Sequence, residues 1–240
     1  MSTEWFRQAI ALLRKDLRAE FRTRTAISAI GVFSLASLFL LALATATLKE
    51  LTFLDNVTGT LKLSWQPPSK FGILWILFFF AAFSGLAHSF VHEEEAGTVT
   101  ALRLMLLPEA IYAGKLFFNF LMVFSVVIVV TPLYMLITGM PLGNPLVFIG
   151  VLIGGCLGLS ATATIIGAIA AKAQNKGALF GALGLPILVV FLMLLMGAAQ
   201  TLFTVVPSAV RILRDVGGLF SFAILLITVS VLTFRFIWED

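Results

Sequence analysis

Charged residues are scarce in this sequence. Only 12% of its 240 residues are Asp, Glu, Lys or Arg, whereas 60% are hydrophobic. A soluble globular domain carries about 25% charged residues, which it needs to cover its water-facing surface. The composition therefore argues against a soluble enzyme, a disordered chain and a nucleic-acid-binding module, and it predicts an integral membrane protein.

Cysteine and histidine are also rare, with one Cys and two His in the chain. Cys156 has no second cysteine or nearby histidine to complete a disulfide or a metal site, so we expect it to pack in the core. Two histidines near one membrane interface leave no credible catalytic arrangement. Because the sequence contains no Gly-x-x-x-x-Gly-Lys-Ser/Thr loop, any ATP is expected to bind a partner subunit.

Long apolar stretches are abundant, and a stretch of about 20 such residues crosses a bilayer as a helix. Six qualify, and they predict an all-α, polytopic membrane protein with one domain over residues 1–240. The predicted spans are Ile27–Leu48, Phe71–Val91, Leu116–Thr138, Pro145–Ala171, Ala178–Ala199 and Gly217–Ile237. If the N-terminus is cytoplasmic, most of the 16 Lys and Arg residues lie inside, which predicts an N-in, C-in topology.

Residues 3–24 form a predicted amphipathic helix rather than a span. Its apolar stripe recurs at three or four residues: Phe6, Ile10, Leu13, Leu17 and Phe21. Its basic residues fall largely on another face: Arg7, Arg14, Arg18 and Arg22. We expect this elbow helix to lie in the membrane interface with the basic face toward anionic lipid headgroups. A dedicated partner-binding role is the alternative.

The predicted spans contain no Asp, Glu or Lys, and Arg235 stands at the end of the sixth. Carriers of ions and protons usually keep ionisable groups near the middle of the membrane, because those groups bind the cargo. The pattern therefore argues against an ion pump or a proton-coupled transporter. It favours a substrate that is itself largely apolar or amphiphilic.

The fourth span carries Gly150, Gly154 and Gly158 at intervals of four, which places them on one helix face. Glycines in this pattern let two helix backbones approach closely. We expect this face to pack against another helix, either within the subunit or in a second subunit.

The segment between the second and third spans predicts a short helix. Gly97 breaks the preceding helix, Thr98 is a suitable N-cap and Pro108 ends the new helix, which leaves Val99–Leu107. This helix is too short to cross a membrane. It is either a surface helix on the bilayer or a coupling helix that inserts into a groove on a cytoplasmic motor subunit.

Two further features have alternative interpretations. His88 and His92 share a helix face at the end of the second span, so they are either candidate haem contacts or hydrogen-bonded interfacial histidines. Residues Pro207–Val216 predict a separate external interfacial helix, which either gates a substrate cavity or is a structural cap.

Three segments resemble the CcmB-type haem exporter subunit of the cytochrome c maturation system. The first is the basic run at 13–24, and the third is 150–171 with Pro186 beyond it. The second is the most specific. It joins 72–75, 93–98 and 106–108 to Gly114-Lys115-Leu116, although three consecutive glutamates replace the family's mixture of acids and bases.

The resemblance implies a permease subunit of an ABC transporter in the bacterial inner membrane, with haem as a candidate transported substrate. Its implied partners are a CcmA-type ATPase and CcmC- and CcmD-type membrane subunits, besides membrane lipid, and no nucleic acid. By position, the coupling segment includes Glu93, Glu94, Glu95, Gly97, Thr98, Leu102, Arg103 and Leu106. ATP-driven closure of the partner is expected to push on this segment and tilt the second and third spans.

Two other functions fit the residues. One is an ABC-2-like permease that exports lipid, drug or polysaccharide. The other is a membrane scaffold or haem-binding subunit that transports nothing itself.

Overall fold

The computed structural model describes residues 4–48, 67–86, 90, 93, 97–171 and 176–239, with the side chains of 42, 44–48, 103, 176–181 and 237–239 left undescribed. Every regular element within these ranges is an α-helix. The helices are α1 (Glu4–Thr23), α2 (Thr25–Leu48), α3 (Pro67–Leu86), α5 (Val99–Met105), α6 (Pro108–Thr138), α7 (Pro145–Ala171), α8 (Lys176–Leu202) and α9 (Ala209–Glu239). The predicted all-α fold class is confirmed.

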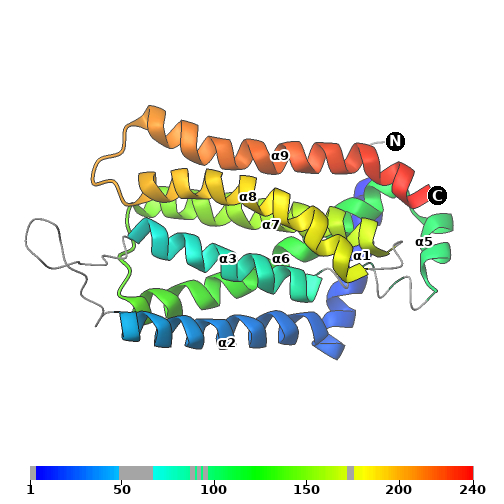
Figure 1. Cartoon of the computed structure of the whole chain (residues 1–240). Helices are drawn as coiled ribbons and strands as arrows, with labels where there is room; N and C mark the ends of the chain where they lie inside the picture. The colour runs from blue at the N-terminus through cyan, green and yellow to red at the C-terminus, as the bar shows by residue number, and fades with distance from the viewer. Residues whose placement is uncertain are drawn as a thin grey trace, which may run out of the picture.

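Six long helices lie side by side in a bundle, each corresponding to one predicted span (Figure 1). Five of them, α3 and α6 to α9, are by themselves long and apolar enough to cross a membrane. The sixth, α2, has 24 residues and no charged side chain. At 1.5 Å per residue it is about 36 Å long, which exceeds the thickness of the hydrocarbon layer.

Both termini, α1 and α5 lie at one end of the bundle, which we call the α5 end (Figure 1). This placement agrees with an even number of crossings. The cytoplasmic location of the α5 end stays a prediction, which is based on the distribution of Lys and Arg.

The boundaries of α7 agree with the prediction, but those of α6 do not. Helix α6 begins at Pro108, eight residues before the predicted start at Leu116. Proline suits the first turn of a helix, where its missing N–H is not needed. Pro108 therefore starts a new helix, and this brings Lys115 inside α6.

The prediction of a separate external helix over Pro207–Val216 is wrong. Residues from Ala209 onward belong to α9, which continues without a break into the predicted sixth span. The adjacent Gly217 and Gly218 lie within α9, and an isolated glycine pair in a helix lowers its stability without ending it. The backbone therefore keeps its helical hydrogen bonds through this point.

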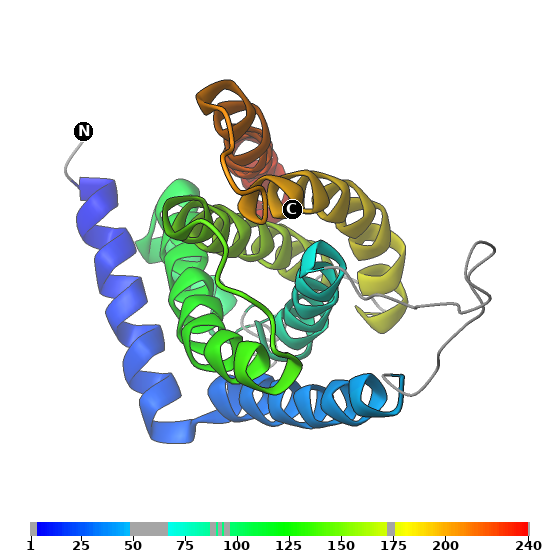
Figure 2. The same ribbon diagram turned by 90° about the vertical axis from the view of Figure 1, so that its left-hand side faces the viewer.

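A sharp elbow joins α1 to α2 at Arg24, whose φ of 55° ends the first helix, and the two helices are bent by 64°. Glu20 supports the elbow because its Oε1 accepts a hydrogen bond of 2.8 Å from the backbone N–H of Ile27. As a result α1 runs along the outside of the bundle and crosses the direction of the spans (Figure 2).

Helix α1 has a third face that the apolar periodicity did not reveal. Ala9, Leu12, Asp16 and Glu20 are its buried residues. They are directed at α6, where a Cβ on Gly114 would lie 3.0 Å from the carbonyl oxygen of Ala9. The predicted apolar stripe lies beside this face. Its first and last side chains are exposed, Phe6 at 49% and Phe21 at 67%.

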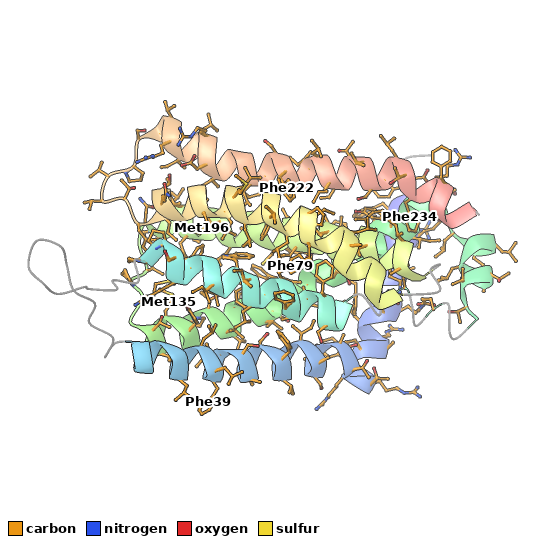
Figure 3. The ribbon with its side chains drawn as sticks, viewed as in Figure 1. Phe39, Phe79, Met135, Met196, Phe222 and Phe234 are labelled. Carbon is orange, nitrogen blue, oxygen red and sulfur yellow. The ribbon has the colours of Figure 1, made fainter. Side chains whose placement is uncertain are left out.

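The core of the bundle is built around Trp75 of α3, which is fully buried. Its indole makes edge-to-face contacts with Phe71, Phe78 and Phe191. Cys156 is also fully buried, as expected. Side chains fill the space between helices, whereas Phe39 projects from the outer side of α2 (Figure 3).

The three glycines of the fourth span face other helices of this chain. A Cβ on Gly150 or Gly154 would lie 3.0 Å from Val216 or 3.2 Å from Phe220, both on α9. One on Gly158 would lie 3.1 Å from Phe191 of α8. The close approach of α7 to α8 and α9 thus occurs within the subunit.

We predict that Gly155→Ala destabilises the bundle, because its Cβ would lie 2.1 Å from the Trp75 ring. Overpacking of a well-filled core costs about 1–3 kcal/mol. The measurement is thermal unfolding in detergent micelles. Gly31→Ala is the control, since a Cβ there meets nothing within 4 Å. Equal stability of the two variants would contradict the prediction.

Candidate functional site

Four charged side chains from three separate segments meet at the α5 end. We call them the charge cluster: Lys15, Asp16, Glu93 and Lys115. Lys115 is the most deeply placed, with its side chain 2% exposed. Its Nζ lies 3.0 Å from Asp16 Oδ2 and 3.1 Å from Glu93 Oε1, so one cation is shared by two carboxylates.

Lys15 adds a second cation to the cluster from the half-exposed side of α1. Its Nζ donates to Glu93 Oε1 and lies 3.4 Å from Asp16 Oδ1. The cluster thus contains two positive and two negative groups. Such balance is needed where charges leave water, because an unpaired buried charge costs several kcal/mol.

The Glu93 carboxylate is stabilised in its charged form. Burial by itself raises the pKa of Glu93, but the charge of Lys115 and hydrogen bonds from Lys15 and Thr98 outweigh it and lower the pKa to about 2. For Lys15, burial works against the charged form, but the hydrogen bond to Glu93 and the two carboxylates raise its pKa.

Glu93 also fixes the start of α5. Gly97 has a φ of 68°, and the backbone N–H of Thr98 donates to the carbonyl oxygen of Glu93 at 3.0 Å. This pairing over five residues around a left-handed glycine is the Schellman pattern that ends a helix. Gly97 is predicted to break the preceding helix; residues 94–96 lie outside the described residues, but the positive φ of Gly97 agrees with a turn before α5.

The predicted N-cap role of the Thr98 hydroxyl is wrong. It makes no capping hydrogen bond to α5. Instead it donates to Oε2 and to the carbonyl oxygen of Glu93. A carboxylate is a stronger acceptor than the neutral groups nearby, so the hydroxyl turns back toward the cluster.

Helix α5 is shorter than predicted and ends at Met105, because Leu106 and Leu107 are extended. The residue before a proline is disfavoured in the helical region, which explains Leu107 before Pro108. The backbone N–H of Leu107 donates to Gln8 Oε1 at 3.1 Å. Both ends of α5 are therefore attached, one to Glu93 and the other to α1.

The two sides of α5 differ. Val99 is buried, and Leu102 and Leu106 pack against a small apolar cluster that contains Leu12 of α1. Leu104 and Met105 point the other way and are 84% and 76% exposed. Leu102 and Leu106, two of the predicted partner contacts, thus face the bundle. The side chains that face outward are Leu104 and Met105, which the sequence analysis does not single out.

The remaining predicted residues are only partly described. Glu94, Glu95, His88 and His92 lie outside the described residues, and of Arg103 only the backbone is described. Phe90 is described and lies beside Lys115, whose Nζ is 5.7 Å from the centre of its ring. The Phe90 ring also packs on Phe234, with ring centres 5.8 Å apart. Phe234 lies near the end of α9, where Figure 3 labels it.

Sequence reasoning missed three of the four cluster residues. The prediction leaves Lys115 in a loop, because it begins the third span at Leu116, whereas α6 begins at Pro108. Asp16 and Lys15 were counted only as part of a basic run. A signal was present, since Asp16 and Glu20 continue the helical spacing of Ala9 and Leu12 on the face that proved to be buried.

At the opposite end of the bundle, a smaller polar group joins α8 to α9. The Thr201 hydroxyl donates to Asp215 Oδ2, and Arg214 pairs with Asp215 Oδ1 at 2.8 Å. The Arg214 side chain is 71% exposed, so this pair is solvated, unlike the charge cluster. In the described part of the chain, no group of three His, Cys, Asp or Glu residues is placed to hold a metal ion.

An apolar bundle of spans with a short, anchored helix at one end defines the class of multi-pass, all-α membrane proteins. A model of the family described as CcmB protein matches residues 7–237, nearly the whole chain. The chain therefore belongs to the CcmB family, a transporter permease family and not an enzyme family. Its members are membrane components of haem-exporting ABC transporters. No curated protein is detectably similar to the chain by sequence comparison.

We predict that Lys115→Met destabilises the fold, because it leaves two buried carboxylates without their shared cation. Removal of one partner from a buried ion pair costs about 3–5 kcal/mol. The measurement is thermal unfolding in detergent. Arg214→Gln removes a cation from the exposed pair and is expected to leave the melting temperature unchanged. Equal melting temperatures of Lys115→Met and the wild type would show that the cluster is dispensable for stability.

The charge cluster also predicts a pH dependence. The pKa of Glu93 is about 2 in the fold against 4.5 ordinarily, so its stabilising effect is complete above pH 4.5 and is lost as the pH falls toward 2. The melting temperature should fall across this window, and the fall should be smaller in Glu93→Gln. Glu109→Gln, at an exposed position, is the control and should retain the wild-type profile. Identical profiles for Glu93→Gln and wild type would contradict the assignment.

Proposed function

We propose that this chain is the permease subunit of an ABC transporter complex in the bacterial inner membrane that supports haem delivery for cytochrome c assembly. Membership of the CcmB family supports the transporter class and the place in a multi-subunit complex. The described spans α3 and α6 to α9 are apolar by composition, which supports haem as a largely apolar substrate.

The proposed partner that supplies energy is a CcmA-type ATPase, which binds α5 from the cytoplasm. The observation that carries this step is the pair Leu104 and Met105, which are 84% and 76% exposed on a helix too short to cross a membrane. A buried Leu or Met side chain contributes about 1.5–3 kcal/mol relative to an exposed one. Two such side chains on an anchored helix are suited to a groove on a motor subunit.

Attachment of α5 to the bundle supports its role as a coupling helix. Val99, Leu102 and Leu106 face inward, and the backbone at both ends is hydrogen-bonded to Glu93 and Gln8. Only Leu106 and Leu107 separate α5 from α6. A push on the outer side of α5 would therefore reach the spans instead of bending a free loop.

The further proposed partners are CcmC- and CcmD-type membrane subunits and the lipid that surrounds the spans. The basic residues of α1, among them Arg14, Arg18 and Arg22, lie on its exposed side. Cations at this position favour contact with anionic headgroups of the cytoplasmic leaflet. This supports an orientation with the α5 end in the cytoplasm.

We predict that Leu104→Glu with Met105→Glu abolishes co-purification of the chain with its ATPase subunit. Loss of about 3 kcal/mol or more from two apolar contacts weakens binding by a factor of about 100. The measurement is recovery of the ATPase after affinity purification of the tagged permease from membranes. Leu213→Glu is the control, because Leu213 is 76% exposed at the opposite end. Full recovery of the ATPase with the double variant would overturn the assignment of α5.

A further inference from the structure

The charge cluster connects segments that are far apart in the sequence. Lys15 and Glu93 are separated by 78 residues, and Glu93 and Lys115 by 22. Lys115 of α6 pairs with both Asp16 of α1 and Glu93, and Lys15 of α1 pairs with Glu93 as well. Helix α1, the segment that starts α5, and α6 are therefore joined at one point.

Helix α5 is joined to α1 directly at its end and through Glu93 at its start. At its start, Thr98 is hydrogen-bonded to Glu93, whose carboxylate is paired with Lys15. At its end, Leu107 is hydrogen-bonded to Gln8 of α1. Between them, Val99 and Leu12 belong to the same apolar cluster. These contacts lie near the two ends of α5.

Separation of α1 from α5 would leave buried charges unpaired. Asp16 and Glu93 are 7% and 6% exposed, and Lys115 is 2% exposed. If one charged side chain moved away, its oppositely charged partner would stay buried without compensation, and this is strongly unfavourable. The lowest-energy movement of this end keeps the four groups together.

The far end of α1 is attached to the first span. Glu20 accepts a hydrogen bond from Ile27 of α2, and the carbonyl oxygen of Glu20 also binds the N–H of Arg24 in the elbow. A displacement of α1 is therefore passed to α2. Figure 2 shows that α1 reaches from its N-terminal end, beside α6, to the start of α2.

From this geometry we infer that the charge cluster is a rigid joint, and that through it α5 moves the elbow helix α1 and the first span α2. Lys15, Asp16, Glu93 and Lys115 are positioning residues in this assignment. The inference rests on the proposed function, in which a partner ATPase pushes on α5. It makes α1 a lever between the coupling helix and α2, in addition to any anchoring in the membrane.

The test uses pairs of spin labels in the complete complex with its ATPase subunit, in lipid nanodiscs, with and without a non-hydrolysable ATP analogue. Cys156 is replaced by Ala, and cysteines for labelling are introduced at Arg18 on α1, Thr100 on α5 and Leu213 at the opposite end. All three positions are exposed. Distances between labels are measured by pulsed electron paramagnetic resonance.

In the wild-type background, the nucleotide is expected to shift the distances from Leu213 to Thr100 and from Leu213 to Arg18, while the distance from Arg18 to Thr100 stays constant. A change in the distance from Arg18 to Thr100 beyond the width of its nucleotide-free distribution would overturn the rigid joint. If the distance to Thr100 does not shift at all, the proposed push on α5 fails, and the joint fails with it.

The decisive variant is Glu93→Gln with Lys115→Met, which removes one charge of each sign and avoids an unpaired buried ion. Substitution of both partners is often neutral for stability, unlike removal of one. We expect the shift of Thr100 and recovery of the ATPase to persist, whereas the shift of Arg18 is lost and cytochrome c assembly falls. A persistent shift of Arg18 would overturn the inference without affecting the docking of the ATPase on α5.

A complementary variant keeps the test independent of the folding of the first. Lys15→Met with Asp16→Asn removes the α1 half of the cluster and leaves the pair of Lys115 with Glu93. It is expected to give the same loss of the Arg18 shift. Arg214→Gln with Asp215→Asn neutralises a pair at the opposite end and is the matched control, with wild-type shifts expected. A wild-type Arg18 shift in the complementary variant would also overturn the joint.

Discussion

Charge neutrality inside an apolar bundle is the constraint on which the α5 end of this protein depends. Lys115 enters the bundle with α6 and has to be paired, because an isolated buried ammonium is too costly to retain. Asp16 reaches it from α1, and Glu93 from the segment that precedes α5. Satisfying this one cation thus fixes α1 against α6 and sets where α5 begins.

The two ends of the molecule differ in how they hold polar groups. At the α5 end three of the four paired charges are buried, whereas at the opposite end Arg214 is largely exposed beside Asp215. Between them the described spans pack through aromatic and small residues, with the Trp75 ring directly against Gly155. A bundle of this kind agrees with a family of transporter permeases.

Much of the fold followed from the sequence, because a span is defined by length and apolar composition alone. The bounds of α7 were predicted to the residue, and the other spans were found within a few turns. The errors fell where proline and glycine had two possible roles: Pro108 begins α6, and Gly217 lies within α9. Of the candidate site, the place of α5 was predictable from local signals, whereas its inward and outward faces were not.

By itself, the sequence determined that the chain is an all-α membrane protein with six apolar segments and a short helix between two of them. These properties depend on composition and on residues close together in the chain. The tertiary structure alone decided that Lys15, Asp16, Glu93 and Lys115 meet, and that Leu104 and Met105 are left outside. Such contacts span up to 99 residues, the separation of Asp16 and Lys115, and depend on the crossing of α1 over α6, which no local periodicity encodes.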